Sequence, residues 1–205
     1  MRQPAAATGN AGRCNGLDVG GMPLRGTSLG LHRRVALWCE PGVGTIRHVL
    51  HAVTNPNEIL DEMLRVLKPG GRLHVLPEDY GMIHDSSSAR ELDRLWQAGW
   101  IEAGRNTGID LCIGRKLPAM LLQRRLCDVQ TDFVVIDSLR VDRTLLTQVF
   151  AHWRDLAGAW LTDNTSVHRS ELRALFAGFL AIADDPAGYV VWQVPIVSAV
   201  KPASG

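Results

Sequence analysis

The chain has 205 residues, with 22 basic and 21 acidic side chains and a formal net charge of +1. This length suits one ordinary domain with a single hydrophobic core, or one domain with a short extension. A content of 46% hydrophobic and 21% charged residues is typical of a folded globular protein. The near-neutral charge gives no general attraction to nucleic acid or to an anionic membrane, so we expect neither as a partner.

The absence of a recognisable targeting signal and the pattern of cysteines predict a cytoplasmic protein. No apolar run reaches the roughly 20 residues that cross a bilayer, and the start of the chain lacks the apolar region of a secretory signal. The four cysteines are scattered without a CxxC pair. This pattern is typical of a reduced protein rather than of a disulfide framework or a zinc site. We therefore expect a cytoplasmic protein without a metal.

Residues 1–45 differ from the rest of the chain. Glycine, proline and arginine are frequent there, and no helical periodicity holds for longer than a turn. Residues 17–19 and 35–39 are each compatible with a short strand. We expect residues 1–45 to be a poorly ordered or atypical segment, followed by an α/β domain over residues 46–205.

The clearest elements follow residue 46. Asn55 and Pro56 suit the N-cap and first position of a helix, whose end is marked by Lys68 and by the glycines that follow it. The apolar residues at helical spacing are Ile59, Leu60, Met63, Leu64 and Leu67. A short strand over residues 72–76 comes next, and Pro77 ends it. Helix, tight turn and strand form half of a parallel crossover unit.

The remaining chain continues to alternate between helices and strands. A capping box at Ser88 and Glu91 predicts a helix through Trp100. Further helices are predicted around residues 117–121, 145–160 and 172–180, and strands over 129–136 and 189–200. In the 145–160 helix, the predicted buried stripe is Leu145, Leu146, Val149, Trp153, Leu156 and Trp160. This alternation predicts an α/β domain with a mainly parallel sheet and the last two strands at one side of it.

One stretch carries a family resemblance. Residues 65–71 read Arg-Val-Leu-Lys-Pro-Gly-Gly, and HVLHAV and Asn-Pro precede them. Together they resemble class I S-adenosylmethionine-dependent methyltransferases of type 11 between the end of the fourth strand and the fifth, and residues 108–122 resemble the helix before the sixth strand. A Pro-Gly-Gly turn alone also occurs in other α/β crossovers. The resemblance implies a Rossmann-like sheet with flanking helices and S-adenosylmethionine as the methyl donor.

The resemblance also suggests which residues bind the cofactor. In this family the residues just after the fourth strand close over the methionine moiety, which places that contact at Ile46, Arg47 and His48. The LDVGG run resembles the start of the glycine-rich cofactor loop and makes Asp18 and Gly20 candidates, although Met-Pro follows where another glycine is expected.

Spacing conflicts with a complete cofactor site. Only 28 positions separate Asp18 from Ile46, whereas one βαβ unit takes about 30 residues and three βα units separate the first strand from the fourth. No residue can be assigned to the ribose hydroxyls. We therefore expect a sheet that is incomplete on its N-terminal side, and weak or absent binding of S-adenosylmethionine.

Acceptor-side candidates follow the 72–76 strand. Glu78 and Tyr80 are candidates for binding the substrate, and Asp79 or His84 for the general base, because imidazole titrates near neutrality and burial can raise a carboxyl pKa. An ordinary solvated loop would also explain these residues. His48 and His51 lack a third ligand for a metal. Methyl transfer from a sulfonium depends largely on alignment, so it does not require a base.

Two functions remain open. The first is methyl transfer to a small-molecule nucleophile. The second is a non-catalytic methyltransferase-like remnant that a partner chain completes, with self-association through an exposed sheet edge. An oxidoreductase on a similar sheet is disfavoured because the chain has no GxGxxG motif.

Overall fold

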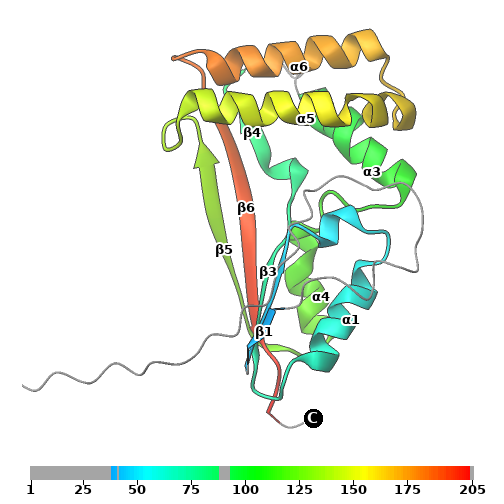
Figure 1. Cartoon of the computed structure of the whole chain (residues 1–205), viewed down its shortest axis with the longest axis vertical. Coiled ribbons are helices and arrows are strands. Elements are labelled where there is room, and N and C mark those ends of the chain that lie inside the picture. The colour runs from blue at the N-terminus through cyan, green and yellow to red at the C-terminus, as the bar shows by residue number, and fades with distance from the viewer. Residues whose placement is uncertain (1–37, 41, 88–92, 204–205) are drawn as a thin grey trace, which may run out of the picture.

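The computed structural model describes residues 38–40, 42–87 and 93–203 (Figure 1). The strands are β1 (Trp38–Glu40), β2 (Val43–Arg47), β3 (Arg72–Leu76), β4 (Ile83–Asp85), β5 (Cys127–Asp137) and β6 (Val190–Val200). The helices are α1 (Pro56–Val66), α3 (Glu102–Thr107), α4 (Leu117–Gln123), α5 (Arg143–Asn164) and α6 (Arg169–Asp184). Shorter helical segments are η2 (Leu50–Ala52), η3 (Tyr80–Met82), the π-helical η4 (Leu95–Ile101) and η5 (Gly114–Lys116). The predicted α/β class, a sheet with flanking helices, is confirmed.

The sheet is mixed rather than mainly parallel, so that part of the prediction is wrong. Its order is β1-β2-β3-β6-β4, and β5 also pairs with β6. Among the described strands only β2 and β3 pair in parallel. A helical crossover through α1 joins these two strands and sets them parallel. The chain enters β6 from α6, which lies beyond the far end of the sheet, so β6 must run in the opposite direction (Figure 1).

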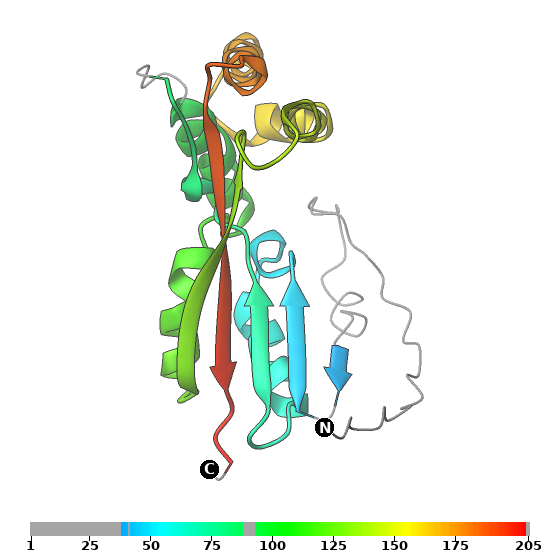
Figure 2. The same ribbon diagram turned by 90° about the vertical axis from the view of Figure 1, so that its left-hand side faces the viewer.

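The two faces of the sheet are covered differently. Figure 2 shows α1 and α4 on the far side of β2, β3 and β6, and no described helix on the near side of β2 and β3. The arrows of β2 and β3 point toward α5 and α6, which lie beyond the carboxyl ends of these strands. This arrangement leaves the parallel pair with one helix-covered face and one face that no described helix covers.

Helix α1 forms as predicted. Pro56 stands at its first position, and four of the five residues predicted on its apolar face are buried: Ile59, Leu60, Met63 and Leu67. The fifth, Leu64, is partly buried against the same core. Asn55 occupies the N-cap position, but its side chain donates to Glu58 and makes no capping hydrogen bond. The buried face packs on Leu73 and Val75 of β3 in the core beneath the sheet.

The turn from α1 into β3 depends on glycine and on a lysine from the end of the chain. Gly70 has a φ of 77°, a left-handed conformation that glycine adopts without strain. Lys201 Nζ donates to the carbonyl oxygens of Leu64 (2.6 Å) and Leu67 (2.8 Å). Because the last carbonyls of a helix lack intrahelical partners, Lys201 satisfies polar groups at the end of α1 that would otherwise need water.

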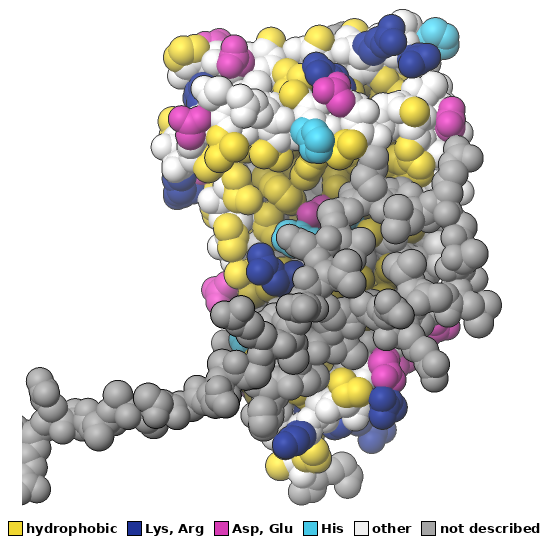
Figure 3. All heavy atoms as spheres, in the orientation of Figure 1, with side chains coloured by type: hydrophobic (Ala, Val, Ile, Leu, Met, Phe, Trp, Pro, Cys, Tyr) yellow, Lys and Arg dark blue, Asp and Glu magenta, His cyan; other side chains and the backbone are white. Residues whose placement is uncertain are grey.

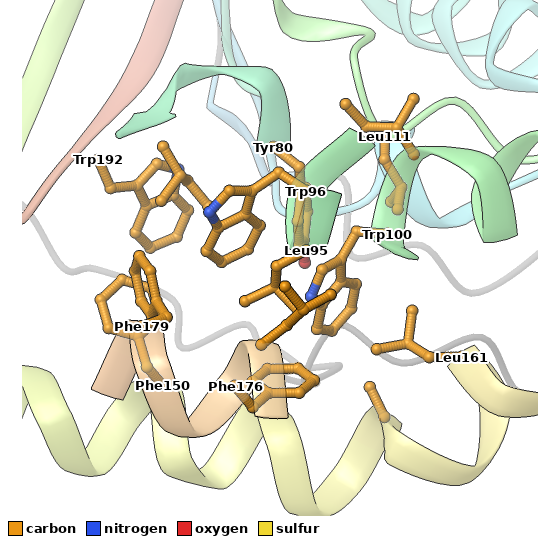
Figure 4. Packing of buried hydrophobic residues seen from close by; sticks show 14 of the residues in the cluster. Tyr80, Leu95, Trp96, Trp100, Leu111, Phe150, Leu161, Phe176, Phe179 and Trp192 are labelled. Atoms are coloured by element: carbon orange, nitrogen blue, oxygen red, sulfur yellow. The ribbon is translucent and has the colours of Figure 1, made fainter. Parts of the chain in front are cut away.

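A second, larger core lies between η4, α5, α6 and the upper part of β6. It is rich in aromatic rings, and Figure 4 shows Trp96, Trp100, Phe150, Phe176 and Phe179 among its members. The helix predicted around residues 172–180 is present as α6, and it buries Leu172, Leu175, Phe176 and Phe179.

On α5 the predicted buried stripe is partly wrong. The buried residues are Leu146, Phe150, Ala157 and Leu161, and Trp153 and Trp160 pack against the same core. Leu145, Val149 and Leu156 are exposed instead. The helix has apolar residues over more than one side, and periodicity does not show which side meets the core.

Some predicted features lie outside the described residues. These are the strand at residues 17–19 and the capping box of Ser88 and Glu91, while β1 overlaps the strand predicted at residues 35–39. The domain boundary at residue 45 stays a prediction. No helix in the described part of the chain is long and apolar enough to span a membrane.

Candidate functional site

The candidate site begins at the carboxyl ends of the parallel strands β2 and β3. Arg47 is the register partner of Leu76, so the carboxyl ends of β2 and β3 lie side by side. The next residue, His48, has a φ of 52°, and its backbone N–H donates to the carbonyl oxygen of Leu76 (3.0 Å). This left-handed residue turns the chain sharply off the sheet.

Glu78 lies at the centre of the cluster. Its side chain is largely buried, and Oε1 accepts a hydrogen bond from Nδ1 of His48 at 2.8 Å. Its other oxygen, Oε2, lies 3.2 Å from Nε2 of His51. Burial alone would raise the pKa of Glu78, yet the hydrogen bond from His48 and the nearby His51 outweigh it and hold that pKa below its usual value. Glu78 is therefore a carboxylate, able only to accept hydrogen bonds.

His51 is the residue that the sequence analysis undervalued. It is 1% exposed. Burial lowers the pKa of His51, an effect that Glu78 opposes and His48 reinforces, so the ring is neutral near pH 7. Although Nε2 lies close to Glu78, neither ring nitrogen makes a hydrogen bond within the described part of the chain. The sequence signal for a shared role of His48 and His51 was their spacing of three residues. In a helical turn such as η2, this spacing brings both rings to the same side.

Tyr80 links the carboxylate to the aromatic core. Burial, and then the charge of Glu78 and a hydrogen bond with it, raise the pKa of Tyr80 well above its usual value. The phenol therefore stays protonated and donates to Glu78. Its ring stacks on Trp153 with 5.4 Å between centroids and lies 5.0 Å from Trp100. Figure 4 shows Tyr80 beside Trp96 and Trp100.

Asp79 is fully buried but engaged elsewhere. Its carboxylate accepts from Nε (2.8 Å), Nη2 (2.6 Å) and the backbone N–H (3.0 Å) of Arg115, and from the backbone N–H of Gly81 (3.1 Å). A Cβ on Gly114 would lie 2.9 Å from Cβ of Asp79 and 2.7 Å from Cγ of Pro195, so this contact requires glycine. Asp79 thus ties the loop after β3 to η5.

The other sequence candidates lie apart from this cluster. Ile46 packs in the core beneath the sheet, and Arg47 is exposed at the end of β2. His84 is exposed on β4 opposite Val191, and no hydrogen bond or ion pair of the described residues joins it to Glu78. Asp18 and Gly20 lie outside the described residues. The structure therefore brings together the candidates His48, Glu78 and Tyr80, and adds His51.

This cluster can hold the proton of a ligand in place but has little power to remove one. The Glu78 carboxylate suits an O–H or N–H donor, and its lowered pKa makes it a weak base. Within residues 38–40, 42–87 and 93–203, no group of three or more His, Cys, Asp or Glu side chains could hold a metal ion.

A known protein family matches the segment that precedes Glu78. Residues 43–75 match the family described as a methyltransferase domain. The matched segment runs from the start of β2 through α1 to Val75 of β3, and it contains the Arg-Val-Leu-Lys-Pro-Gly-Gly motif. The resemblance to class I methyltransferases is confirmed over these residues. No curated protein sequence matches the chain.

Two solved structures resemble parts of this chain at a low TM-score. Phosphoethanolamine N-methyltransferase 2 from Haemonchus contortus, in complex with phosphomonomethylethanolamine and S-adenosylhomocysteine, is 16% identical with a TM-score of 0.39. The alignment covers 78% of this chain and 33% of that enzyme. The [4+2]-cyclase SpnF is 18% identical with a TM-score of 0.39, and the alignment covers 80% of this chain and 50% of the cyclase. The chain thus spans between a third and half of the length of these two proteins.

Proposed function

We propose that this α/β unit serves S-adenosylmethionine-dependent methyl transfer to a small-molecule nucleophile, and that Glu78 and Tyr80 belong to the acceptor side of the site. The observation that carries the proposal is the buried Glu78 carboxylate, held between His48, His51 and Tyr80 at the carboxyl ends of adjacent parallel strands. Open α/β sheets bind ligands at this end of their strands. The match to the methyltransferase domain ends three residues before Glu78.

The residues after β2 suit the methionine end of the cofactor. His51 keeps two buried ring nitrogens without a hydrogen-bond partner among the described residues, which suits a polar ligand beside this loop. His48 and the exposed Arg47 border the same loop, whereas the side chain of Ile46 faces the core. We infer that residues 47–51 hold the methionine end of the cofactor, and that the affinity is weak because the described residues provide no ribose carboxylate.

The residues of the chain then act by positioning. When bound, S-adenosylmethionine supplies an activated methyl group on its sulfonium, so alignment of the acceptor accounts for most of the rate. Glu78 accepts a hydrogen bond from the O–H or N–H of the methyl acceptor. This hydrogen bond orients the lone pair of the methyl acceptor's nucleophilic atom. Tyr80 and His48 donate to Glu78 and fix the carboxylate. Asp79, which Arg115 holds, keeps the loop in place.

Ligand-observed NMR with S-adenosylhomocysteine tests the cofactor assignment, because this method detects weak complexes. We expect a dissociation constant weaker than about 100 μM, which corresponds to a binding free energy of about −5.5 kcal/mol or less in magnitude. His48→Ala should weaken binding further, whereas the matched control His74→Ala, on the adjacent strand, should not. ATP is the control ligand. It should give no binding signal that is lost when S-adenosylhomocysteine is added.

Two results would contradict this assignment. Absence of any saturable signal at millimolar S-adenosylhomocysteine would refute the proposed cofactor. A micromolar affinity would refute the weak, one-sided site, and would indicate that residues 1–45 contribute a cofactor cradle.

The uncovered sheet face favours a second candidate function. Because no described helix covers the near face of β2 and β3, a non-catalytic unit completed by a partner chain would also explain the fold (Figure 2). A stoichiometric complex with a second protein that lacks all response to S-adenosylhomocysteine would favour this candidate over methyl transfer.

A further inference from the structure

Strand β5 forms a long edge of the sheet that has no partner among the described strands. It runs over 11 residues, and within the described part of the chain it pairs only with β6. Figure 1 shows β5 at the margin of the sheet, with no described strand or helix on its outer side. The exposed edge expected from the sequence lay on the N-terminal side of the sheet, whereas β5 lies on the opposite side, beyond β6. This edge is therefore a separate candidate for an interface.

The pairing of β5 with β6 shows which backbone groups lie on this edge. The N–H of Ser138 donates to the carbonyl oxygen of Val190 at 3.0 Å, so these two residues form a hydrogen-bonded pair. Hydrogen-bonded and non-hydrogen-bonded pairs alternate along an antiparallel ladder, so the even-numbered residues over 130–136 also bond to β6. The residues between them direct their N–H and C=O groups away from β6. These outward-facing residues are Thr131, Phe133 and Val135.

Most of β5 lacks the features that usually keep a strand edge unpaired. Natural edges are blunted by lysine, by proline, by a bulge or by a very short strand. The irregular register of β5 lies between Cys127 and Gln130, at the start of the strand. Residues 131–136 read TDFVVI, with one charged side chain and no lysine, proline or glycine. The strand beyond its first few residues is therefore open to pairing with another strand.

Exposed apolar side chains lie beside this edge. Phe133 is 48% exposed and Val134 is 42% exposed, and they lie on opposite faces because side chains alternate along a strand. Leu122 and Leu139, which precede and follow the strand, are exposed as well. Figure 3 shows hydrophobic side chains gathered at the margin of the molecule below α5, where β5 ends. Pairing of this edge would therefore bury apolar surface on both faces of the sheet.

We propose that a second copy of this chain pairs with this edge, so that two sheets join through antiparallel β5 strands around a two-fold axis at Phe133. This axis places Phe133 of one copy opposite Phe133 of the other, and Thr131 opposite Val135. Every outward-facing residue then meets an outward-facing residue, so the N–H and C=O groups of both edges bond to each other. The two phenylalanine rings form a cross-strand aromatic pair.

Neighbouring registers are less favourable. An axis at Asp132 would place two carboxylates directly opposite each other, which is destabilising. An axis at Val134 would place Thr131 opposite Asp137, whose carbonyl oxygen already accepts from the backbone N–H groups of Arg140 and Val141. The axis at Phe133 avoids both conflicts.

The strand chemistry favours a second copy over other partners. An unpaired edge specifies its partner more closely than an apolar face does, because its N–H and C=O groups are satisfied by another strand. The outward-facing residues of β5 are complementary to themselves under a two-fold axis, and such an interface closes as a dimer rather than as a filament. Because β6 separates β5 from β3, this contact does not involve Glu78, and the inference does not rest on the proposed function.

Light scattering on the full chain, with charge substitutions at Phe133, tests the pairing. Phe133→Lys places two ammonium groups opposite each other and should raise the dimer dissociation constant at least about tenfold. Phe133→Glu should do the same with two carboxylates. An equimolar mixture of the two variants should dimerise more tightly than either variant alone, because position 133 of one copy faces position 133 of the other. Val43→Lys is the matched control, because Val43 is 42% exposed at the start of β2. It should leave the dimer intact.

A backbone substitution and hydrogen exchange test the register. Val135→Pro removes an N–H that only the second copy would bond, so it should dissociate the dimer while circular dichroism shows a folded chain. In the wild-type dimer the amides of Thr131, Phe133 and Val135 should be protected from exchange. In Val135→Pro the amides of Thr131 and Phe133 should exchange fast, whereas the amide of Val134, which bonds to β6, should stay protected.

Several results would overturn the inference. One is a monomer at all concentrations, and another is fast exchange of the three outward-facing amides in a wild-type dimer. A dimer that Val43→Lys dissociates and Phe133→Lys does not would place the contact on the face of β2 and β3 instead of the β5 edge. A mixture of Phe133→Lys and Phe133→Glu that dimerises no more tightly than either variant alone would show that position 133 does not face itself.

Discussion

Replacing Asp79 with alanine removes the acceptor of four hydrogen bonds, three from Arg115 and one from the backbone of Gly81. The sequence alone made Asp79 a candidate base. Its geometry instead predicts that the main effect of Asp79→Ala is a loss of stability, because the carboxylate joins the loop after β3 to η5.

The expected loss of stability is estimated from the hydrogen bonds that each donor loses. The backbone N–H groups of Arg115 and Gly81 would lose their acceptor, and an unsatisfied buried donor costs about 1–3 kcal/mol. The guanidinium of Arg115 is 46% exposed and can turn to water, so we add little for it. The sum is about 3 kcal/mol. For a chain of this size, 1 kcal/mol corresponds to about 2–4 °C in Tm, so Asp79→Ala should lower Tm by about 6–12 °C.

Thermal unfolding monitored by circular dichroism measures this effect. Asp79→Asn keeps one acceptor oxygen and should lose about half as much. Asp155→Ala is the control, because Asp155 forms an exposed ion pair with Arg154 and should leave Tm nearly unchanged. An unchanged Tm in Asp79→Ala would refute the anchoring role and return Asp79 to the candidates for proton transfer.

Three further predictions concern the core, the acid–base cluster and the sheet face. Leu67→Asp places a charge in the core beneath β3 and should cost several kcal/mol, about 3–5; an unchanged Tm would contradict the assigned packing. The pKa values of His51 and Glu78 are both lowered by folding, so the unfolded chain binds more protons, and stability should fall as pH drops below about 6.5 and again below about 4.5. His51→Phe should flatten the first part of that decline, and a flat wild-type profile from pH 7 to 4 would refute the cluster. The face of β2 and β3 that no described helix covers predicts self-association in light scattering at rising concentration. A monomer at all concentrations, with β3 amides protected from hydrogen exchange, would show that this face is satisfied within one chain.

The elements best predicted from sequence are those set by neighbouring residues. Helix α1 and strand β3 follow from a proline at the first helical position, an apolar repeat and a glycine turn, all within 21 residues from Pro56 to Leu76. Strand direction is different, because it depends on the route between strands. The mainly parallel prediction was wrong because α5 and α6 return the chain into β6 from the far end of the sheet.

The positions of the candidate site residues could be predicted from the sequence, but the side chains that contact them could not. Glu78 and Tyr80 were found because they follow a strand, and His48 because it follows another. The contact of Glu78 with His51 and the capture of Asp79 by Arg115, 36 residues away, are tertiary and leave no local signal. On α5 the sequence shows apolar residues on several sides, and only the packed structure shows that Leu146 and Phe150 are buried while Val149 is not.

The position of β6 has a consequence for how the molecule is made. It is the last strand of the sheet in sequence, yet it pairs with β3, β4 and β5. On the ribosome, α1 can form early from local contacts, but these three strands cannot be joined until residues 190–200 have emerged. Pairings between residues this far apart along the chain form slowly. Nascent chains should therefore leave β3 and β5 without this pairing partner until residues 190–200 have emerged, which makes the growing chain a client for chaperones.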